Sequence, residues 1–352
     1  YDLVMLALEN GKHVVTANKA LIAEHGGTIF AQAEARGLMV CYEAAVAGGI
    51  PIIKALREGL SANRINWLAG IINGTTNFIL SEMDTKGREF ADVLSEAQAK
   101  GYAEADPTFD VEGIDASHKL AILASIAFAM PLSLDGLFTD GITQLEPQDV
   151  AYARELGYVI KHLGIARQSD AGVELRVHPT LVPERSLIAG VNDVANAIMV
   201  NADAVGTTLF YGPGAGAEPT ASAVIADIVD VARVMDSYPD SWVPGLGCNS
   251  SAIQPRTIMD IEDVETGFYI RFSALDKPGV LSDVTKIMGD AGISIEAIIQ
   301  REQPAGERYV NVIILTNVTK EKFLNEAVTH IEQLETVRGE VSFIRVEYLD
   351  QV

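Results

Sequence analysis

Apolar and polar positions recur along this chain with periods that change from region to region. Over residues 1–41 the pattern predicts helix, strand, helix and strand, which is typical of the later half of a parallel α/β unit. The stretch 42–205 mixes helical and strand-like periods. The helices that we expect in it are 91–101, 117–130 and 150–164, and the strands include 64–73 and 173–183.

The last third of the chain has a pattern of its own. A long helix is predicted over 220–236, and a Pro-, Gly- and Ser-rich linker over 237–262. Then follow strand, helix, strand, strand, helix and strand, the ferredoxin-like βαββαβ order. The sequence therefore predicts α/β and α+β architecture: a partial Rossmann-like parallel sheet, an α+β substrate and dimerisation domain, and a ferredoxin-like C-terminal domain. The domains that we expect are 1–41 with 206–262, 42–205, and 266–352.

Composition narrows the function classes. The chain has 352 residues, more than one core usually holds, and a net charge of −22, which disfavours nucleic acid as a partner. No apolar run is long enough for a membrane span, and the start does not resemble a signal peptide. The two cysteines, Cys41 and Cys248, exclude a disulfide framework and favour a reducing, cytoplasmic location. No histidine has the spacing of a zinc ligand.

The stretch "GYAEADPTFDVEGIDASHK" places several acids before one lysine and an apolar run. If a helix begins just before Asp115, then Asp115 and Lys119 share a face that points inward. A lysine held by a carboxylate suits proton transfer, and Glu104 and Asp110 would bind a cationic group such as an α-ammonium. The alternative is a surface loop of acids at a helix start, with Asp115 and Lys119 as a solvated pair.

Two segments have the composition of a cofactor site. Thr16, Asn18 and Lys19 follow a strand of the parallel type, and ligands of open α/β sheets bind outside the carboxyl ends of the strands. Three glycines precede the helix at 220–236, where the backbone can approach a phosphate near a helix N-terminus. These are Gly212, Gly214 and Gly216. The alternatives are a helix start capped by Asn18 and a flexible turn.

Short polar side chains and a lone acid also stand near strand ends. Asn73 and Thr75 fit recognition of a small polar substrate, or else a capped turn. Glu43, followed by small residues with uncovered carbonyls, would form an oxygen-lined monovalent cation site or a tight strand exit. Cys41 is expected to be inert core, and Cys248 has no neighbouring histidine to activate it.

Together these segments resemble the homoserine dehydrogenase family. The matching segments are "VVTANKALIA", "YEAAVAGGIPII", "GIINGTTNFIL", "AQAKGYAEADPTFDVEGIDASHKLAIL", "YARELGY" and "YGPGAGAEPTASAV". They follow the family's order and cover almost the whole chain together with the C-terminal module. That module, with "DKPGVL", resembles an ACT domain, which often binds free amino acids.

The resemblance implies reversible reduction of L-aspartate 4-semialdehyde to L-homoserine with NADP or NAD, on the route to threonine and methionine. Lys119 would donate the proton, and Asp115 would hold substrate and lysine together. Glu104 would bind the substrate's amino group, and Lys19 would line the site between nicotinamide and substrate. The residue types agree with this reaction, because hydride transfer to an aldehyde creates an alkoxide, which needs a positioned acid such as the lysine.

The resemblance also implies ligands outside the reaction centre. A sodium ion is held near the hinge in the family, and the matching positions are Glu43, Val46, Gly48 and Ile50. The ACT-like domain implies feedback by an amino acid, for which we expect L-threonine, and a homodimer or homotetramer. The family's G-x-G-x-x-G strand–turn–helix is not found near the start of this sequence, where a dinucleotide-binding fold carries it.

Two other functions are compatible with the same residues. One is a non-catalytic amino-acid sensor that acts through the ACT-like domain and does not oxidise NAD(P)H. The other is a cysteine-dependent semialdehyde dehydrogenase with Cys41 or Cys248 as the nucleophile. Thiol alkylation would stop the second and would not affect a lysine-dependent reductase.

Overall fold

The structure is a computed structural model that describes residues 1–237, 242–301 and 308–349. The chain forms two compact units, each built from segments that are separate in sequence. The first comprises Tyr1–Gln144, His162–His178 and Gly190–Met259. The second comprises Leu145–Lys161, Pro179–Ala189 and Asp260–Val352.

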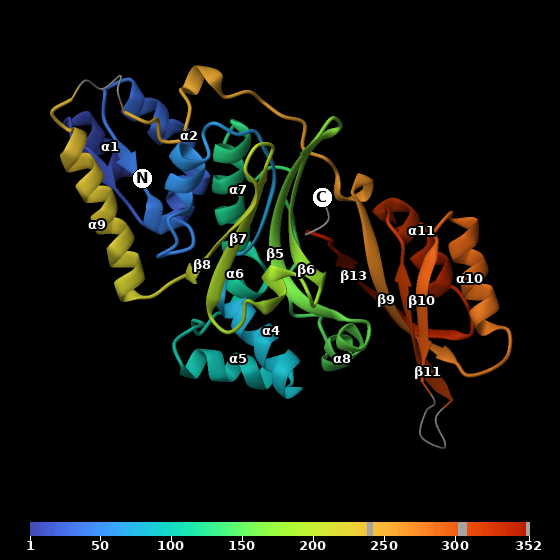
Figure 1. Ribbon diagram of the computed structural model, residues 1–352. Coiled ribbons are helices and arrows are strands. Elements are labelled where there is room, and N and C mark those ends of the chain that lie inside the picture. The colour runs from blue at the N-terminus through green and yellow to red at the C-terminus, as the bar shows by residue number, and fades with distance from the viewer. Residues whose placement is uncertain (238–241, 302–307, 350–352) are drawn as a thin grey trace. The chain divides into compact units, whose positions relative to one another are not determined.

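The chain begins with the predicted helix, strand, helix and strand (Figure 1). These are α1 (Asp2–Glu9), β1 (Val14–Val15), α2 (Lys19–Glu34) and β2 (Val40–Cys41). The two strands are parallel, with Val14 opposite Val40. Their carboxyl ends therefore lie at one edge, where the chain continues into α2 and into the segment after Cys41.

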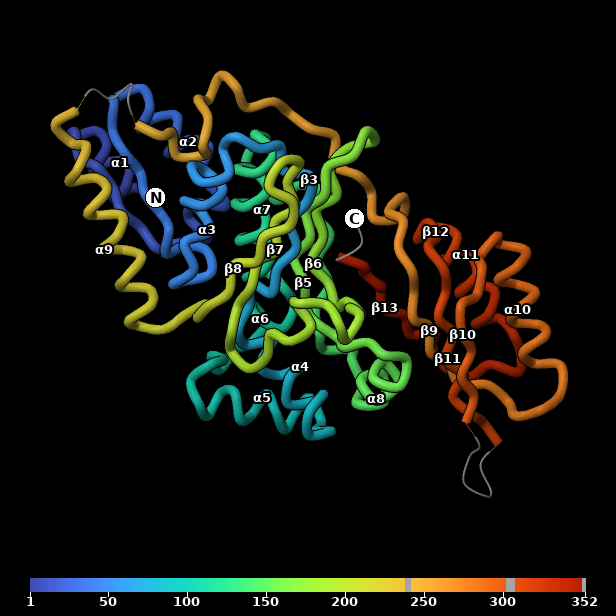
Figure 2. Tube along the Cα trace, viewed as in Figure 1, coloured from blue at the N-terminus to red at the C-terminus, as the bar shows by residue number. Residues whose placement is uncertain are grey.

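An extended sheet follows, and its strands lie side by side in Figure 2. It belongs to the first unit except for residues 158–161 and 179–183, which belong to the second. The order is β6-β5-β3-β7-β8, and β4 pairs with β6. The bounds are β3 (Ile65–Ile71), β4 (Phe138–Thr139), β5 (Tyr158–Ser169), β6 (Gly172–Pro183), β7 (Ala195–Ala202) and β8 (Gly206–Pro213). The predicted strands at 64–73 and 173–183 are confirmed.

Helices of the first unit pack against this sheet and against each other. Their bounds are α3 (Ile52–Lys54), α4 (Gly74–Lys86), α5 (Phe90–Ala99), α6 (Thr108–Val111), α7 (Ile114–Phe128) and α9 (Ala217–Val234). Helix α4 contacts β7 and α7 contacts β3. The predictions of helices at 91–101, 117–130 and 220–236 are confirmed within a few residues at their ends.

The predicted helix at 150–164 is wrong in its second half. Helix α8 (Pro147–Glu155) ends early, Gly157 has a φ of +84°, and β5 starts at Tyr158. The strand is buried continuously from Tyr158 to Ala166. A strand that is covered on both faces loses its alternation, so its period does not distinguish it from a buried helix.

The second unit contains the predicted βαββαβ module. Its elements are β9 (Glu265–Leu275), α10 (Val280–Asp290), β10 (Ile295–Gln300), β11 (Tyr309–Thr316), α11 (Glu321–Glu332) and β13 (Val337–Val346). The antiparallel order is β10-β11-β9-β13. A short β12 (Thr319–Lys320) pairs with β9, and β13 also pairs with β6 at Thr180 and Leu181.

The predicted linker at 237–262 falls partly outside the described residues, at 238–241. Its later part runs along β6 in the first unit, where Val173 forms a bridge with Ile258 and donates a hydrogen bond from its main-chain N to the carbonyl of Thr257. This part of the chain is thus anchored to the sheet rather than spanning open solvent.

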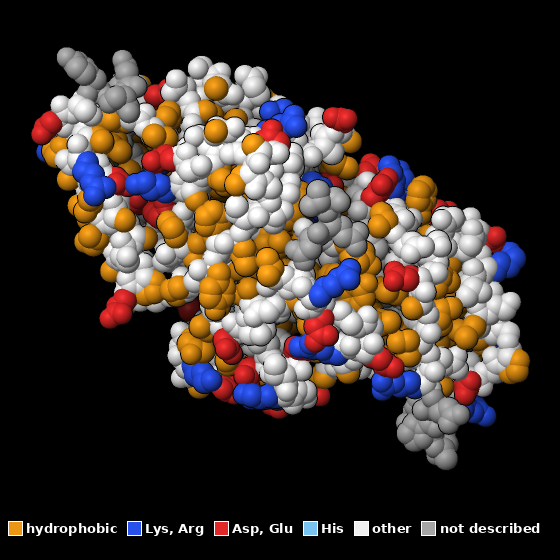
Figure 3. Space-filling model, viewed as in Figure 1, with side chains coloured by type: hydrophobic (Ala, Val, Ile, Leu, Met, Phe, Trp, Pro, Cys, Tyr) orange, Lys and Arg blue, Asp and Glu red, His pale blue; other side chains and the backbone are white. Residues whose placement is uncertain are grey.

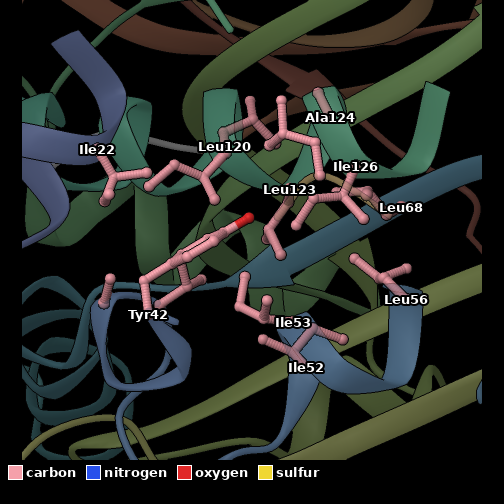
Figure 4. Close-up of a cluster of buried hydrophobic side chains, with 14 of the residues drawn as sticks. Ile22, Tyr42, Ile52, Ile53, Leu56, Leu68, Leu120, Leu123, Ala124 and Ile126 are labelled. Carbon is pink, nitrogen blue, oxygen red and sulfur yellow. The ribbon is translucent and has the colours of Figure 1, made fainter. Parts of the chain in front are cut away.

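The apolar run after Lys119 forms the core of the first unit. Figure 4 shows Leu120, Leu123 and Ala124 of α7 against the side chains of Tyr42 and Ile52. Each fully buried leucine or isoleucine contributes about 1.5–3 kcal/mol of transfer free energy. Because one helix supplies both this core and the acids at its start, its first turn is held firmly in place.

The surface carries both signs of charge. On the face visible in Figure 3, acidic and basic side chains are interspersed with hydrophobic ones. Among the described residues, helices with the length and apolar character needed to cross a membrane are absent.

Candidate active site

The first turn of α7 brings Asp115 and Lys119 together in the protein interior. Gly113 precedes the helix with a φ of +81°, a conformation that favours glycine. Asp115 is 2% exposed and Lys119 is 9% exposed. The pair is therefore buried, and the alternative of a solvated surface pair is wrong.

The Asp115 carboxylate accepts hydrogen bonds from two side chains and forms an ion pair with a third. Lys119 Nζ lies 2.7 Å from Oδ2, Asn73 Nδ2 lies 2.8 Å from Oδ2, and Lys19 Nζ lies 2.5 Å from Oδ1. Burial raises the pKa of Asp115, but the two ammonium groups outweigh it and hold that pKa at about 2. Lys119 Nζ also donates to the main-chain carbonyl of Ile72, at 2.7 Å.

The two lysines differ in their access to water. Lys19 is the first residue of α2, its side chain is 34% exposed, and its Nζ lies 5.5 Å from the centre of the Phe109 ring. The Lys119 side chain is 11% exposed. One carboxylate thus joins a buried ammonium to one in contact with solvent.

Asn73 connects this carboxylate to a second acid. Its Nδ2 donates to Asp110 Oδ1 at 2.7 Å, and its Oδ1 accepts from the main-chain N of Thr76, which caps α4. Burial raises the pKa of Asp110, the Asn73 bond opposes this, and the charge of Asp115 adds to it. Thr75 Oγ1 donates to the carbonyl of Tyr102 at 2.6 Å.

Five of the predicted site residues form one bonded cluster: Lys19, Asn73, Asp110, Asp115 and Lys119. Glu104 is exposed in the loop between α5 and α6, and its main-chain carbonyl accepts from Gln98 Nε2 at 3.1 Å. It lies outside the bonded cluster.

The predicted cofactor residues Thr16 and Asn18 lie at the carboxyl end of β1. Thr16 Oγ1 accepts from the main-chain N of Asn18 at 3.1 Å, and Asn18 Oδ1 accepts from the main-chain N of Leu21 at 3.0 Å. Asn18 is therefore the N-cap of α2, as the alternative expected. The cap also fixes the direction in which Lys19 leaves the helix.

The glycine segment contacts the loop that leaves β2. The main-chain N of Gly49 donates to the carbonyl of Pro213 at 3.1 Å, and a Cβ on Gly48 would lie 2.5 Å from the carbonyl oxygen of Gly214. Gly216 has a φ of +117° and precedes α9, which contacts β1. Gly212 is in β8. The glycine segment therefore lies against the loop that leaves β2, and Thr16 and Asn18 lie at the end of the neighbouring parallel strand β1.

Glu43 uses its carboxylate to cap α3. Its two oxygens accept from the main-chain N atoms of Ile53 and Lys54, each at 2.9 Å. Burial raises the pKa of Glu43 to about 7, against the effect of these two bonds. In the described part of the chain, clusters of three or more His, Cys, Asp or Glu side chains able to hold a metal are absent.

Comparisons with known proteins agree with this geometry. The family model described as homoserine dehydrogenase matches residues 51–229. The homoserine dehydrogenase of Pseudomonas aeruginosa is 60% identical over 350 residues, which are 99% of this chain and 81% of that protein. The chain belongs to the homoserine dehydrogenase family. Two further models match, the homoserine dehydrogenase NAD-binding domain at 1–43 and an ACT domain at 268–336.

Solved structures of the homoserine dehydrogenase family share the fold. A homoserine dehydrogenase from Thiobacillus denitrificans has a TM-score of 0.93 at 59% identity, over 98% of this chain and 79% of that one. A hyperthermophilic archaeal homoserine dehydrogenase in complex with NADPH has a TM-score of 0.58 at 27% identity, over 67% and 69%. The NAD-binding match and the NADPH complex support an NAD(P) cofactor for this oxidoreductase family.

Two features of this homoserine dehydrogenase site were not predicted. The Ile72 carbonyl that binds Lys119 is a main-chain group, so no residue type indicates it. Phe109 lies against both Lys19 and the ring of His118, 5.4 Å away. Its place in an acidic segment, next to Asp110, is a signal that could have been used.

The cysteines have the environment of inert residues. Cys41 is buried, and burial raises the pKa of its thiol to about 12. Burial, with the nearby charge of Glu34, also raises the pKa of Cys248. Nucleophilic cysteines need a lowered pKa, so neither thiol is prepared for covalent catalysis.

Proposed function

We propose that this chain reduces the aldehyde of L-aspartate 4-semialdehyde to L-homoserine, reversibly, with NAD(P)H. The observation that carries the proposal is the buried Lys119 ammonium, fixed by Asp115 and the Ile72 carbonyl. A general acid must be within hydrogen-bond reach of the oxygen that it protonates, and a buried, oriented ammonium meets this requirement.

The chain's own residues have distinct tasks in this mechanism. A bound nicotinamide would supply the hydride that the carbonyl carbon accepts. Lys119 Nζ donates its proton to the alkoxide oxygen and becomes a neutral amine. Asp115 keeps the amine in place, and the charge of Lys19 stabilises the developing anion. The Lys19 side chain is 34% exposed, so its ammonium exchanges protons with solvent.

Recognition of the substrate's amino group falls to the acids that precede α7. Asp110 binds Asn73 through Oδ1, and we assign its other oxygen to the substrate ammonium. Glu104, in the exposed loop, is assigned to the same ammonium from the family resemblance. Asn73 and Thr75 support the site by holding Asp110, Asp115 and the carbonyl of Tyr102.

Replacing Lys119 by Met in the full-length protein tests the proposal. General acids contribute about 10²–10⁴-fold to rate, so kcat should fall at least about 100-fold in steady-state assays with both substrates. Lys286→Met is the matched control, because that lysine is 75% exposed and pairs with Asp290 one turn along α10. A folded Lys119→Met protein that retains wild-type kcat would refute the role.

Thiol alkylation separates this mechanism from the cysteine-dependent rival. Treatment with iodoacetamide should leave turnover within about two-fold of the untreated enzyme, because the pKa values of both thiols are raised. Loss of turnover in step with modification of Cys41 or Cys248 would favour the rival instead.

We also propose that the ACT domain binds L-threonine as an inhibitor. A cavity of about 150 Å³ lies at the turn between β9 and α10, beside Lys277, Gly279 and Gln300. The start of α10 suits a carboxylate, and Asp276, which accepts from Gln300 Nε2, suits an ammonium. Calorimetric titration with L-threonine, alongside the activity assay, tests this; absence of both binding and inhibition would reject threonine.

The homodimer or homotetramer and the sodium ion rest on the family resemblance. Sedimentation equilibrium distinguishes the oligomeric states from a monomer. Because amides occupy both carboxylate oxygens of Glu43, sodium binding would depend mainly on the main-chain oxygens of Glu43, Val46, Gly48 and Ile50. Identical activity and thermal stability in sodium and in choline buffers would count against the ion.

A further inference from the structure

The sheet of the ACT domain has one face covered by its own helices. Phe268, Ile270 and Phe272 of β9 point into the core that α10 and α11 close. Side chains alternate along a strand, so Tyr269 and Arg271 point to the opposite face. Tyr269 is nevertheless fully buried, and the Arg271 side chain is 12% exposed.

Helix α8 of the same compact unit covers these two residues. Asp149 of α8 is completely buried, and its carboxylate accepts from Tyr269 Oη at 3.0 Å and from Arg271 at 2.5 and 3.1 Å. The same carboxylate accepts from the main-chain N of Glu146 and so caps α8. Removing one partner of such a buried, bidentate pair leaves an uncompensated charge, so β9 and α8 are strongly joined.

Two weaker contacts extend the attachment along the helix. Asn311 Nδ2 of β11 donates to Gln148 Oε1 at 2.7 Å. Arg301 pairs with Glu155 and lies 5.3 Å from the centre of the Tyr152 ring. The exposed ion pair contributes little to stability. The attachment of α8 to the ACT sheet therefore depends mainly on the buried bonds of Asp149.

Helix α8 leads directly into β5, whose later residues belong to the unit that contains Lys119. In that unit, His162 of β5 donates from Nε2 to the Asp140 carbonyl at 3.0 Å. A Cβ on Gly113 would lie 3.2 Å from His162 Cε1. Gly113 begins α7, so β5 is packed against the turn that positions Asp115 and Lys119.

We propose that α8 transmits the state of the ACT domain to the active site. A shift of β9 moves Asp149, α8 follows as a unit, and β5 carries the movement to the start of α7. The proposal rests on the proposed function for its regulatory meaning and for the choice of effector. The link itself can be tested without an effector.

Hydrogen exchange on a double-mutant cycle tests the link in the full-length protein. The variants are Asp149→Asn, Arg271→Gln and the two combined. We expect amide exchange to become at least about 10-fold faster in both 147–157 and 158–166 in each single variant, with no further increase in the double variant. Faster exchange confined to 147–157, or additive effects, would overturn the proposal.

A core residue on the helix-covered face of the ACT sheet supplies the control. Met288 of α10 is fully buried in the core that α10 and α11 close. Met288→Ala should loosen this core, because it leaves a cavity, while exchange at 158–166 stays within about two-fold of wild type. An equal response of 158–166 in this control would mean that the Asp149 pair only stabilises the domain.

The effector gives an independent readout. Asp149→Asn should bind L-threonine within about three-fold of the wild-type affinity and lose at least about 10-fold in sensitivity to inhibition, in the range of typical coupling. Met288→Ala should retain both. Full inhibition of a folded Asp149→Asn protein would refute transmission. If threonine does not bind the wild type, the proposed effector fails and the exchange result decides on the link.

Discussion

At the residue scale, the Asp115 carboxylate connects Lys119, Asn73 and Lys19 in one site. The sequence predicted the Asp115–Lys119 pair because spacing along a helix is a local property. The partnership of Asp115 with Lys19 was not predictable by spacing, since the two are brought together only by packing of α2 and α7. The bond from Asn73 Nδ2 to Asp115 likewise depends on packing, whereas the N-cap bond of Asn73 to Thr76 is local and is the capped turn that the sequence offered as the alternative.

His162 is a buried titratable group with a consequence for stability. Burial lowers the pKa of His162 to about 4, against the bond to Asp140. A histidine in the unfolded chain has a pKa near 6.5. Between pH 4 and pH 6.5 His162 is therefore protonated in the unfolded chain and neutral in the folded chain. This contribution to stability is complete above pH 6.5 and is lost as the pH falls towards 4.

Urea unfolding at pH 7.5 and pH 5.0 measures this effect. The wild type should lose about 2 kcal/mol more between the two pH values than His162→Gln, which keeps a donor and does not titrate. Equal losses in the two proteins would show that His162 does not carry the pH dependence.

At the element scale, the start of α7 depends on the absence of a side chain. A Cβ on Gly113 would meet Thr139, His162 and Val177 at 3.1–3.2 Å, and the residue has a φ of +81°. Gly113→Ala should therefore cost about 2–4 kcal/mol of stability and lower kcat, because it displaces the turn that holds Asp115.

Gly87 is the matched comparison. It ends α4 with a φ of +61°, and a Cβ there would meet no atom within 4 Å. Gly87→Ala should cost about 1 kcal/mol and leave kcat unchanged, because only the backbone conformation is penalised. Thermal unfolding and initial rates of both variants test this; equal effects on kcat would contradict the role of Gly113.

Elements were predictable where their period was clear. The amphipathic α10 and α11 of the ACT domain, and β10 with its alternating burial, were found from the sequence. The change from α8 to β5 was missed, because Tyr158–Ala166 are buried throughout and show no alternation. Gly157, with its positive φ, was the available signal for the boundary.

At the scale of the molecule, the division into domains at 1–41 with 206–262, 42–205 and 266–352 stays a prediction. The two compact units divide the chain at other positions, because residues 145–161 and 179–189 belong to the same unit as the C-terminal segment. Sequence order favours contiguous domains, and only three-dimensional contacts such as Arg271–Asp149 reveal that α8 belongs with the ACT sheet.

Removal of residues 266–352 should therefore affect more than regulation. Helix α8 has 9 residues, too few for a stable isolated helix, and its buried partners would be gone. Limited proteolysis should cut the truncated protein within 147–157 and the full chain far more slowly. Helix α5, with 10 residues and packed on α4, should resist in both. Equal resistance of α8 in both proteins would contradict this.

The Asp149–Arg271 pair also has a consequence for biosynthesis, because 122 positions separate the two residues. At about 5–20 residues per second, a ribosome needs roughly 6–24 s to deliver the arginine after the aspartate. Throughout that interval Asp149 of the nascent helix lacks the arginine with which it pairs in the folded protein. A chaperone that shields this stretch during translation would raise the yield of active enzyme without any effect on the finished protein.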